Sequence, residues 1–231
     1  MPYILLGEAA YIKYADSLLG LQLTPIPLTP ETRLNKIVNT HADTLIWSDG
    51  KVYIINREYI KNLPPELTRY FTQTEDSPMG EYPNDTVFNA LTIGKYIFSR
   101  TQSLSPTIRD IAASNGYTLV NVKQGYARCS TLALPQANAA LTADNGMADT
   151  LRTHGIDVLT IQCGHVALSG CEYGFIGGAS FVDERTRTVY FFGDIFAHPD
   201  ADRIIQFLKK RGYETASLAG TLTDYGGAVI I

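Results

Sequence analysis

Residues 124–144, QGYARCSTLALPQANAALTAD, contain the pattern that repeats through the chain. Two apolar runs flank Pro135-Gln136-Ala137-Asn138, an arrangement typical of two strands joined by a tight turn. A short helical pattern, NGMADTLRTHG, follows, and after Gly155 the apolar run IDVLTIQ predicts a third strand. The local unit is therefore strand, strand, helix, strand.

Four other parts of the chain resemble this unit. The first strands of the predicted hairpins enter at Asp43, Asp85, Cys129, Gly177 and Gly226, at intervals of roughly 42 to 49 residues. The helix ends also repeat, because SNGYTLVNV, THGIDVLTI and KRGYETASL each place a glycine before a strand. Such a unit cannot bury its apolar face alone, which favours a closed ring of units. The alternative is an ordinary α/β sheet with coincidental spacing.

The two ends of the chain are expected to close this ring. The chain finishes on the apolar strand TDYGGAVII, whose missing partner is PYILLG at residues 2–7. Pairing these two strands leaves no free sheet edge. The sequence thus predicts one α/β domain over residues 1–231, a five-bladed pseudo-symmetric propeller. The approximate units are 226–231 plus 1–28, 41–80, 82–122, 124–162 and 173–218.

Composition narrows the classes of function. The chain has 231 residues, 45% of them hydrophobic, which is enough for a substantial core. The net charge is -4 and the basic residues are scattered, so we expect no nucleic-acid partner. The run Tyr3–Leu6 is too short for a membrane span or a signal peptide, so a cytoplasmic protein without membrane association is expected. Three cysteines favour free thiols over a disulfide framework.

Several longer strings carry a family resemblance. HADT, YPNDTVFNALTIGK, QGYARCS, YGFIGGAS and the final DYGGAVII resemble a bacterial family whose members share a guanidino-modifying-enzyme fold and have no known function. With the five units, they make the chain similar to the pentein superfamily, the five-bladed α/β propellers. That superfamily includes arginine deiminase, dimethylarginine dimethylaminohydrolase, agmatine deiminase and glycine amidinotransferase, and also the non-enzymatic ribosome anti-association factor of archaea and eukaryotes. The resemblance covers nearly the whole chain and implies a fold more than a chemistry.

The resemblance also implies where a site would lie. In the enzymes of this superfamily a cysteine thiolate attacks the guanidinium carbon, a histidine moves protons and carboxylates bind the cation. These groups sit where the first strands enter, around the ring axis. The segment YPNDTVFNA resembles the one that supplies a substrate-binding carboxylate, so Asp85 matches that carboxylate, and Asn89 is expected to bind substrate with it.

Two parts of the enzymes' catalytic set are missing from their usual places. The segment that holds the histidine corresponds to GFIGGAS, and the segment that holds the cysteine corresponds to DYGGAVII. Neither contains the expected residue. This departure argues against the usual deiminase or hydrolase mechanism.

A different set of residues remains. Cys129 lies beside Arg128, whose charge would lower the pKa of the thiol. His41 and Asp43 occupy another entrance, in a spacing that puts both on one face of a strand. The alternative interpretations are structural: Cys129 would be a small buried residue that starts a strand, and Asp43, like Asp85, a turn or cap residue.

Other candidates are less specific. Gly177 and Gly178 in YGFIGGAS allow close backbone approach or an amide-lined anion site. Asp224 would line one mouth of the ring or cap a strand.

A histidine between two cysteines raises the question of a metal. His165 sits in CGHVALSGC between Cys163 and Cys171, and with Cys129 these residues would offer zinc ligands. Their spacing matches no standard zinc signature, so no metal and no cofactor are expected. The role of Cys163 and Cys171 stays open, as does the oligomeric state.

Two functions from different classes follow. The favoured one is a small-molecule-binding or scaffold domain that lacks the usual catalytic pair. The alternative is an enzyme acting on a guanidino, amidino or related small nitrogenous substrate, with Cys129 as nucleophile and His41 or His165 as base. In that alternative Asp43 and Asp85 bind the cationic group.

Overall fold

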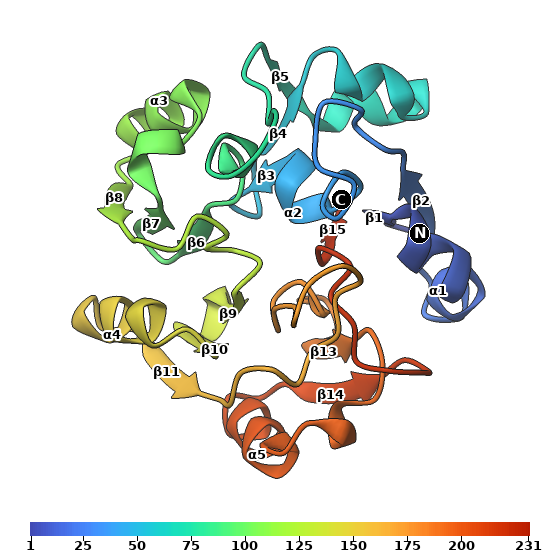
Figure 1. Cartoon of the computed structure of the whole chain (residues 1–231), viewed down its shortest axis with the longest axis vertical. Coiled ribbons are helices and arrows are strands. Elements are labelled where there is room, and N and C mark those ends of the chain that lie inside the picture. Colours follow the sequence, from blue (N-terminus) through green and yellow to red (C-terminus); the bar gives the residue numbers. More distant parts are fainter.

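Five three-stranded sheets surround a common centre in the computed structural model, which describes residues 1–231 (Figure 1). In every sheet the middle strand pairs antiparallel with the inner strand and parallel with the outer strand. This pairing fits five pseudo-repeats of the predicted unit. The sheets are β15 (Ala228–Ile230), β1 (Tyr3–Gly7) and β2 (Thr24–Leu28); β3 (Ile46–Ser48), β4 (Tyr53–Asn56) and β5 (Thr72–Thr74); β6 (Leu91–Ile93), β7 (Tyr96–Ser99) and β8 (Thr118–Asn121); β9 (Thr131–Leu134), β10 (Ala139–Thr142) and β11 (Asp157–Thr160); β12 (Ser180–Asp183), β13 (Thr188–Phe191) and β14 (Glu214–Ser217).

Helices connect the second and third strands and lie on the outside of the ring (Figure 1). They are α1 (Glu8–Gly20), α3 (Pro106–Ser114), α4 (Asn145–Thr153) and α5 (Ala201–Lys210). In the remaining unit two 3-10 helices, Tyr59–Asn62 and Pro65–Tyr70, take this place, because Pro64-Pro65 cannot continue an α-helix. No helix is both long and apolar enough to cross a membrane.

The start of α3 is defined by a cap residue and a proline. Ser105 is the N-cap, and its hydroxyl accepts a hydrogen bond from the N–H of Ile108 at 3.3 Å. Pro106 takes the first helical position, where its missing N–H costs nothing.

The two ends of the chain lie side by side, as expected. β15 pairs antiparallel with β1, with Ile4 opposite Ile230 and Leu6 opposite Ala228. Tyr3 and Ile231 extend the pairing through two reciprocal backbone hydrogen bonds of 3.0 and 2.9 Å. The first sheet therefore exists only when both ends of the chain are in place.

The apolar core lies between neighbouring units. Each of five buried clusters joins residues of two adjacent sheets and their helices. Along β1, Ile4 and Leu6 pack in one cluster and Leu5 in the next, since alternate side chains of a strand point to opposite faces. Every sheet is thus held by both of its neighbours.

The strand expected to carry His41 and Asp43 on one face is wrong in part. Ala42–Leu45 forms a single helical turn, α2, and β3 begins only at Ile46. The N–H of Asp43 donates to Gly226 O at 3.0 Å instead of to a strand partner. His41 and Asp43 therefore do not share the face of a strand. The boundaries of the five units stay a prediction.

Candidate functional site

The loops that precede the five inner strands meet at the centre of the ring. Backbone contacts tie them together: Gly178 N–H donates to Cys129 O at 2.9 Å, and Asp43 N–H donates to Gly226 O. We call the residues gathered there the hub. The hub consists of His41, Asp43, Asp85, Asn89, Arg128, Cys129, Gly177, Gly178 and Asp224, all of them residues singled out from the sequence.

Cys129 is held on two sides. Its thiol donates toward Asp224, with Sγ 3.4 Å from Oδ2 and 3.7 Å from Oδ1. Its backbone N–H donates to Asn89 Oδ1 at 3.1 Å. The residue is only 4% exposed, so the sulfur is fixed in the interior and not at a surface.

Asp224 is oriented by backbone donors. Its Oδ2 accepts the N–H of Phe175 at 2.8 Å, and its Oδ1 accepts the N–H of Gly226 at 2.9 Å. Both carboxylate oxygens face the Cys129 sulfur as well. The carboxylate is therefore a fixed acceptor for the thiol proton.

The expectation that Arg128 activates the thiol is wrong. Burial raises the pKa of Cys129 well above its ordinary value, and the charges of Asp224 and Asp43 raise it further. The Arg128 guanidinium points elsewhere, donating to Ile46 O at 3.1 Å and Ala228 O at 3.2 Å. Burial and the two carboxylates thus favour the protonated thiol over the thiolate.

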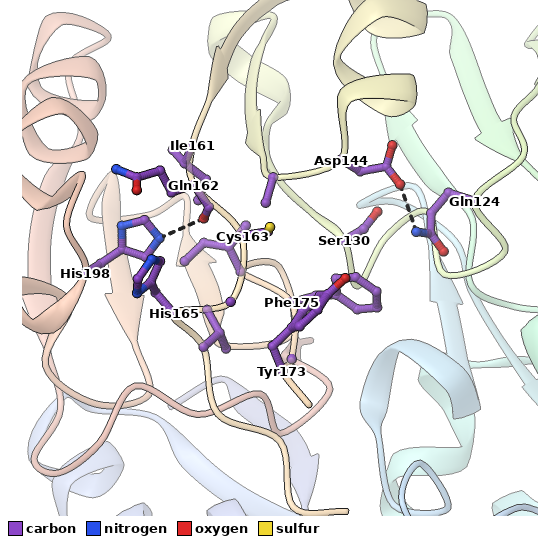
Figure 2. Close-up of a pocket in the computed structure, with 15 residues that line it drawn as sticks. Gln124, Ser130, Asp144, Ile161, Gln162, Cys163, His165, Tyr173, Phe175 and His198 are labelled. Carbon is purple, nitrogen blue, oxygen red and sulfur yellow. Dashed lines mark hydrogen bonds between the residues drawn. The ribbon is translucent and has the colours of Figure 1, made fainter. Parts of the chain in front are cut away.

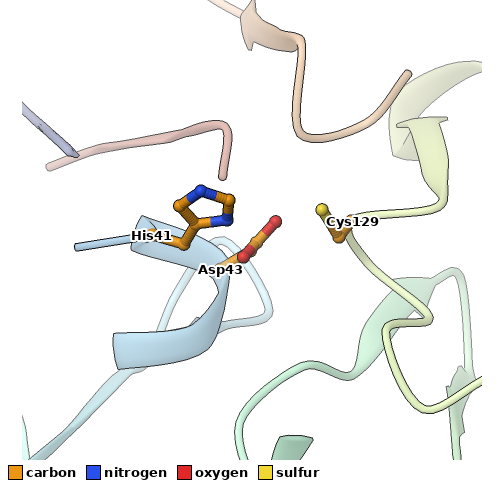
Figure 3. Close-up of side chains that lie close together, drawn as sticks. All are labelled: His41, Asp43 and Cys129. Atoms are coloured by element: carbon orange, nitrogen blue, oxygen red, sulfur yellow. The ribbon is translucent and has the colours of Figure 1, made fainter. Parts of the chain in front are cut away.

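A second carboxylate, that of Asp43, also lies near the sulfur. Figure 3 shows the Asp43 carboxylate between the His41 ring and Cys129, with one ligating atom of each residue within 4.8 Å of the others. Asp43 Oδ1 accepts the Thr44 hydroxyl at 3.3 Å, but Oδ2 is buried without a hydrogen-bond partner. Burial raises the pKa of Asp43, and the neighbouring Asp224 carboxylate adds to the rise, against the opposing effect of the Arg128 charge.

Asp85 and Asn89 form the adjoining part of the hub. Asn89 Oδ1 accepts the N–H groups of both Arg128 and Cys129, which leaves its buried Nδ2 without an acceptor. The Tyr126 hydroxyl donates to Asp85 Oδ2, and Asp85 Oδ1 has no partner. Burial raises the pKa of Asp85. Tyr126 was not selected from the sequence, although it stands in the string QGYARCS beside two residues that were.

The glycines of YGFIGGAS permit close approach, as expected. A Cβ on Gly178 would clash with Asp224 Oδ1 and lie 2.7 Å from Cys129 Sγ. A Cβ on Gly177 would lie 2.5 Å from Arg128 O and 2.6 Å from Cys129 O. Because the Gly178 N–H is already bound to Cys129 O, the packing interpretation fits better than an anion site.

His165 lies apart from Cys129. It is exposed and lines a separate cavity of about 140 Å³ between neighbouring units, where its ring lies 5.3 Å from that of His198 (Figure 2). No hydrogen bond connects it to Cys129, so the geometry gives no support to His165 as a base. Cys163 and Cys171 are exposed and free, and the zinc ligand set considered with them is not assembled.

A larger cavity reaches the hub from the side of the hairpin turns. It has a volume of about 690 Å³, and Asp43, Arg128 and Gly177 line it together with the turns at 48–51 and 183–185. A small organic ligand can be accommodated in a space of this size. Asp43 is thus the hub carboxylate that lines this cavity.

Solved structures of dimethylarginine dimethylaminohydrolase share this fold. The enzyme from Pseudomonas aeruginosa, a cysteine-to-serine mutant complexed with citrulline, aligns with a TM-score of 0.59 and 11% identity over 99% of this chain and 98% of that chain. An adduct of the enzyme with 4-chloro-2-hydroxymethylpyridine gives a TM-score of 0.60 with 11% identity, over 99% of both chains. A histidine-to-glycine mutant carrying S-methyl-L-thiocitrulline gives 0.59 with 11% identity, again over 99% of both chains. The resemblance to the pentein superfamily is confirmed at the level of the fold.

Sequence comparison gives a narrower assignment. No curated protein matches the chain. Residues 5–229, nearly the whole length, match the family of unknown function DUF6873, and the chain belongs to that family.

Proposed function

We propose that the hub binds a small organic cation of the guanidino or amidino type. The observation that carries this proposal is Asp43 Oδ2, a buried carboxylate oxygen without any hydrogen-bond partner, at the inner end of the 690 Å³ cavity. Buried polar groups are normally paired, and an unpaired carboxylate is costly. A ligand with N–H donors and a positive charge supplies the missing partner.

The charges of the hub support a cationic ligand. The hub contains three buried carboxylates, Asp43, Asp85 and Asp224, and one arginine, the half-buried Arg128. The Arg128 guanidinium donates to two backbone carbonyls and makes no ion pair with a carboxylate. A planar guanidinium or amidinium matches carboxylates through paired N–H donors. A solved structure of the same fold is complexed with citrulline, which supports a small nitrogen-rich ligand.

Calorimetry on methylguanidine, agmatine and arginine tests this proposal. Asp43→Asn should weaken binding about tenfold or more, because a hydrogen bond to a charged group contributes about 1.5–3 kcal/mol. The matched control is Asp110→Asn, which alters an exposed carboxylate on α3. Equal affinities for Asp43→Asn and Asp110→Asn, or no binding by the unaltered protein, would refute the proposal.

A second candidate function, catalysis, is favoured by the contact between Cys129 and Asp224. In this scheme Sγ attacks the guanidino carbon while Asp224 takes the thiol proton, and the C–N bond then breaks as the departing amine accepts a proton. Water next displaces the sulfur, which gives a ureido product and restores the thiol. Binding the cation opposes the negative charges that hold the thiol protonated, so the ligand itself would promote the attack.

Intact-protein mass spectrometry tests catalysis. In a Cys163→Ser/Cys171→Ser background, incubation with the ligand and acid quenching should reveal a covalent adduct on Cys129, with ureido product in solution. Cys129→Ser should abolish both while keeping calorimetric binding. Binding with neither adduct nor product would leave the hub as a binding site and exclude this chemistry.

We also propose that the five sheets form one closed propeller. The pairing of β15 with β1 supports closure, as do the five apolar clusters between neighbouring units. Closure would hold the five hub loops at fixed positions around one axis.

A further inference from the structure

Three hub side chains are close enough together to bind one metal ion. The guanidino proposal rests on only one of them, Asp43. His41, Asp43 and Cys129 offer one nitrogen, one oxygen and one sulfur atom within 4.8 Å of one another, and all three residues are buried. We propose that these three residues bind a thiophilic divalent cation of the zinc type. The repeat placed Asp43 and Cys129 at equivalent entrances, but their spacing in the sequence matches no metal-binding signature.

Asp43 and His41 offer ligating atoms that are free of other hydrogen bonds, whereas the Cys129 thiol would have to give up its hydrogen bond to Asp224. Asp43 Oδ2 is buried without a hydrogen bond, and the His41 side chain does not cap the helical turn that it precedes. The Cys129 thiol lies 3.4 and 3.7 Å from the two Asp224 oxygens and also interacts with Asp43. Figure 3 shows the three side chains converging from two segments of the chain. An ion placed among them would break no hydrogen bond of the Asp43 Oδ2 atom.

The separations between the three ligating atoms would suit zinc once the side chains move slightly closer together. With zinc–ligand bonds of about 2.0–2.3 Å, tetrahedral geometry places the ligand atoms roughly 3.4–3.6 Å apart. The observed separations of up to 4.8 Å therefore require the side chains to close by about 1 Å, which is within the reach of small side-chain rotations. His41 and Asp43 lie two residues apart at one helical turn, so they can close on the ion together.

The charges favour a doubly charged ion. A bound thiolate at Cys129 together with the three hub carboxylates would carry four negative charges, and Arg128 supplies one positive charge. A divalent cation would offset most of this excess. Mg²⁺ and Ca²⁺ prefer six or more oxygen ligands, whereas a thiolate and an imidazole select zinc and its chemical neighbours.

The fourth coordination position would stay open. Both oxygens of Asp224 are engaged by the N–H groups of Phe175 and Gly226, so this carboxylate is held back from the ion. Asp43 lines the 690 Å³ cavity, so water or a ligand can reach the ion from there. A site with three protein ligands and one open position is the arrangement of catalytic zinc centres.

Cobalt spectroscopy tests the site directly. In the Cys163→Ser/Cys171→Ser background, metal-stripped protein titrated with Co²⁺ should develop a cysteine-to-cobalt charge-transfer band and the visible bands of tetrahedral cobalt. The bands should saturate at one ion per chain and disappear on adding Zn²⁺. Cys129→Ser should lack the charge-transfer band, and His41→Gln should weaken Co²⁺ binding at least about tenfold. His165→Gln, which alters a histidine in the other cavity, should leave the titration unchanged.

The outcomes are distinguishable from those of the guanidino proposal. A charge-transfer band that persists in Cys129→Ser, or no band in the unaltered hub, overturns the metal site. If Cys129→Ser fails to fold, as judged by its thermal unfolding, the comparison of His41→Gln with His165→Gln decides instead. Calorimetry on methylguanidine uses Asp43→Asn and no metal, so either proposal can fail while the other stands. Where both hold, saturating Zn²⁺ should abolish methylguanidine binding, since both ligands need Asp43.

Discussion

At the hub, backbone and side chains approach one another more closely than a methyl group allows. We expect Gly178→Ala to destabilise the protein by about 1–3 kcal/mol, the usual cost of overpacking a well-filled site. The reason is that the new Cβ would clash with Asp224 and crowd the Cys129 sulfur. Gly20→Ala is the matched control: nothing lies within 4 Å of its Cβ position at the end of α1, so stability should not fall. Urea denaturation of both variants checks this, and equal midpoints would contradict the tight packing of the hub.

Sequence reasoning predicted which residues would gather, but not how they would pair. The repeat placed Asp43, Asp85 and Cys129 at equivalent entrances, and the structure brings all three to the centre. The partner of the thiol is Asp224, from a loop near the other end of the chain, and spacing alone cannot show such a contact. The sign of the effect on the Cys129 pKa was also out of reach, because burial and two carboxylates outweigh a neighbour in the sequence.

At the scale of elements, one histidine joins the loop after β11 to the start of α5. His198 Nδ1 accepts the N–H of Asp200 at 3.0 Å, so the ring proton is on Nε2, which donates to Gln162 O at 3.2 Å. The Gln162 N–H in turn donates to Asp200 Oδ2 at 2.7 Å. Burial lowers the pKa of His198 below its ordinary 6.5, and protonation of Nδ1 would remove the acceptor for Asp200.

This junction predicts a loss of stability in acid. Because the folded state binds a proton at His198 less readily than the unfolded state does, the free energy of unfolding should fall as pH drops below about 6.5. His198→Asn has no titratable ring and should show a smaller decrease between about pH 7.5 and about pH 5. Denaturation curves of both proteins at the two pH values measure the difference. Parallel decreases would mean that His198 is not the responsible group.

Elements with strong local signals were predicted well, and those set by distant contacts were not. Ser105-Pro106 defines the start of α3 within the segment itself, through a cap and a proline. The turn α2 depends instead on a hydrogen bond from Asp43 to Gly226, a residue almost at the other end of the chain. The strand predicted at His41 and Asp43 is therefore replaced by a helical turn that tertiary contacts impose.

For the whole molecule, the pairing of β15 with β1 predicts that the end of the chain is indispensable. Removing residues 228–231 should abolish cooperative unfolding or lower its midpoint sharply. The reason is that Ala228 and Val229 are buried in two clusters that join three units. The matched control is a circular permutant in which a short turn joins Ile231 to Tyr3 and the chain is opened at the Asp49-Gly50 turn. This permutant should keep the fold, and thermal unfolding of both would decide. A truncated protein as stable as the full chain would contradict closure of the ring.

The near-equivalence of the five hub loops has a consequence for how chemistry can evolve in this architecture. The resemblance implies a cysteine in the loop before β15, whereas Cys129 of this chain belongs to the loop before β9. A reactive side chain lost from one blade and gained on another still points at the same axis. Point substitutions can therefore move a nucleophile from one hub loop to another while every sheet stays intact. A comparison that aligns such proteins position by position will overlook a site residue that has moved to another unit. Superposing the structures after a rotation by one or more units would find it.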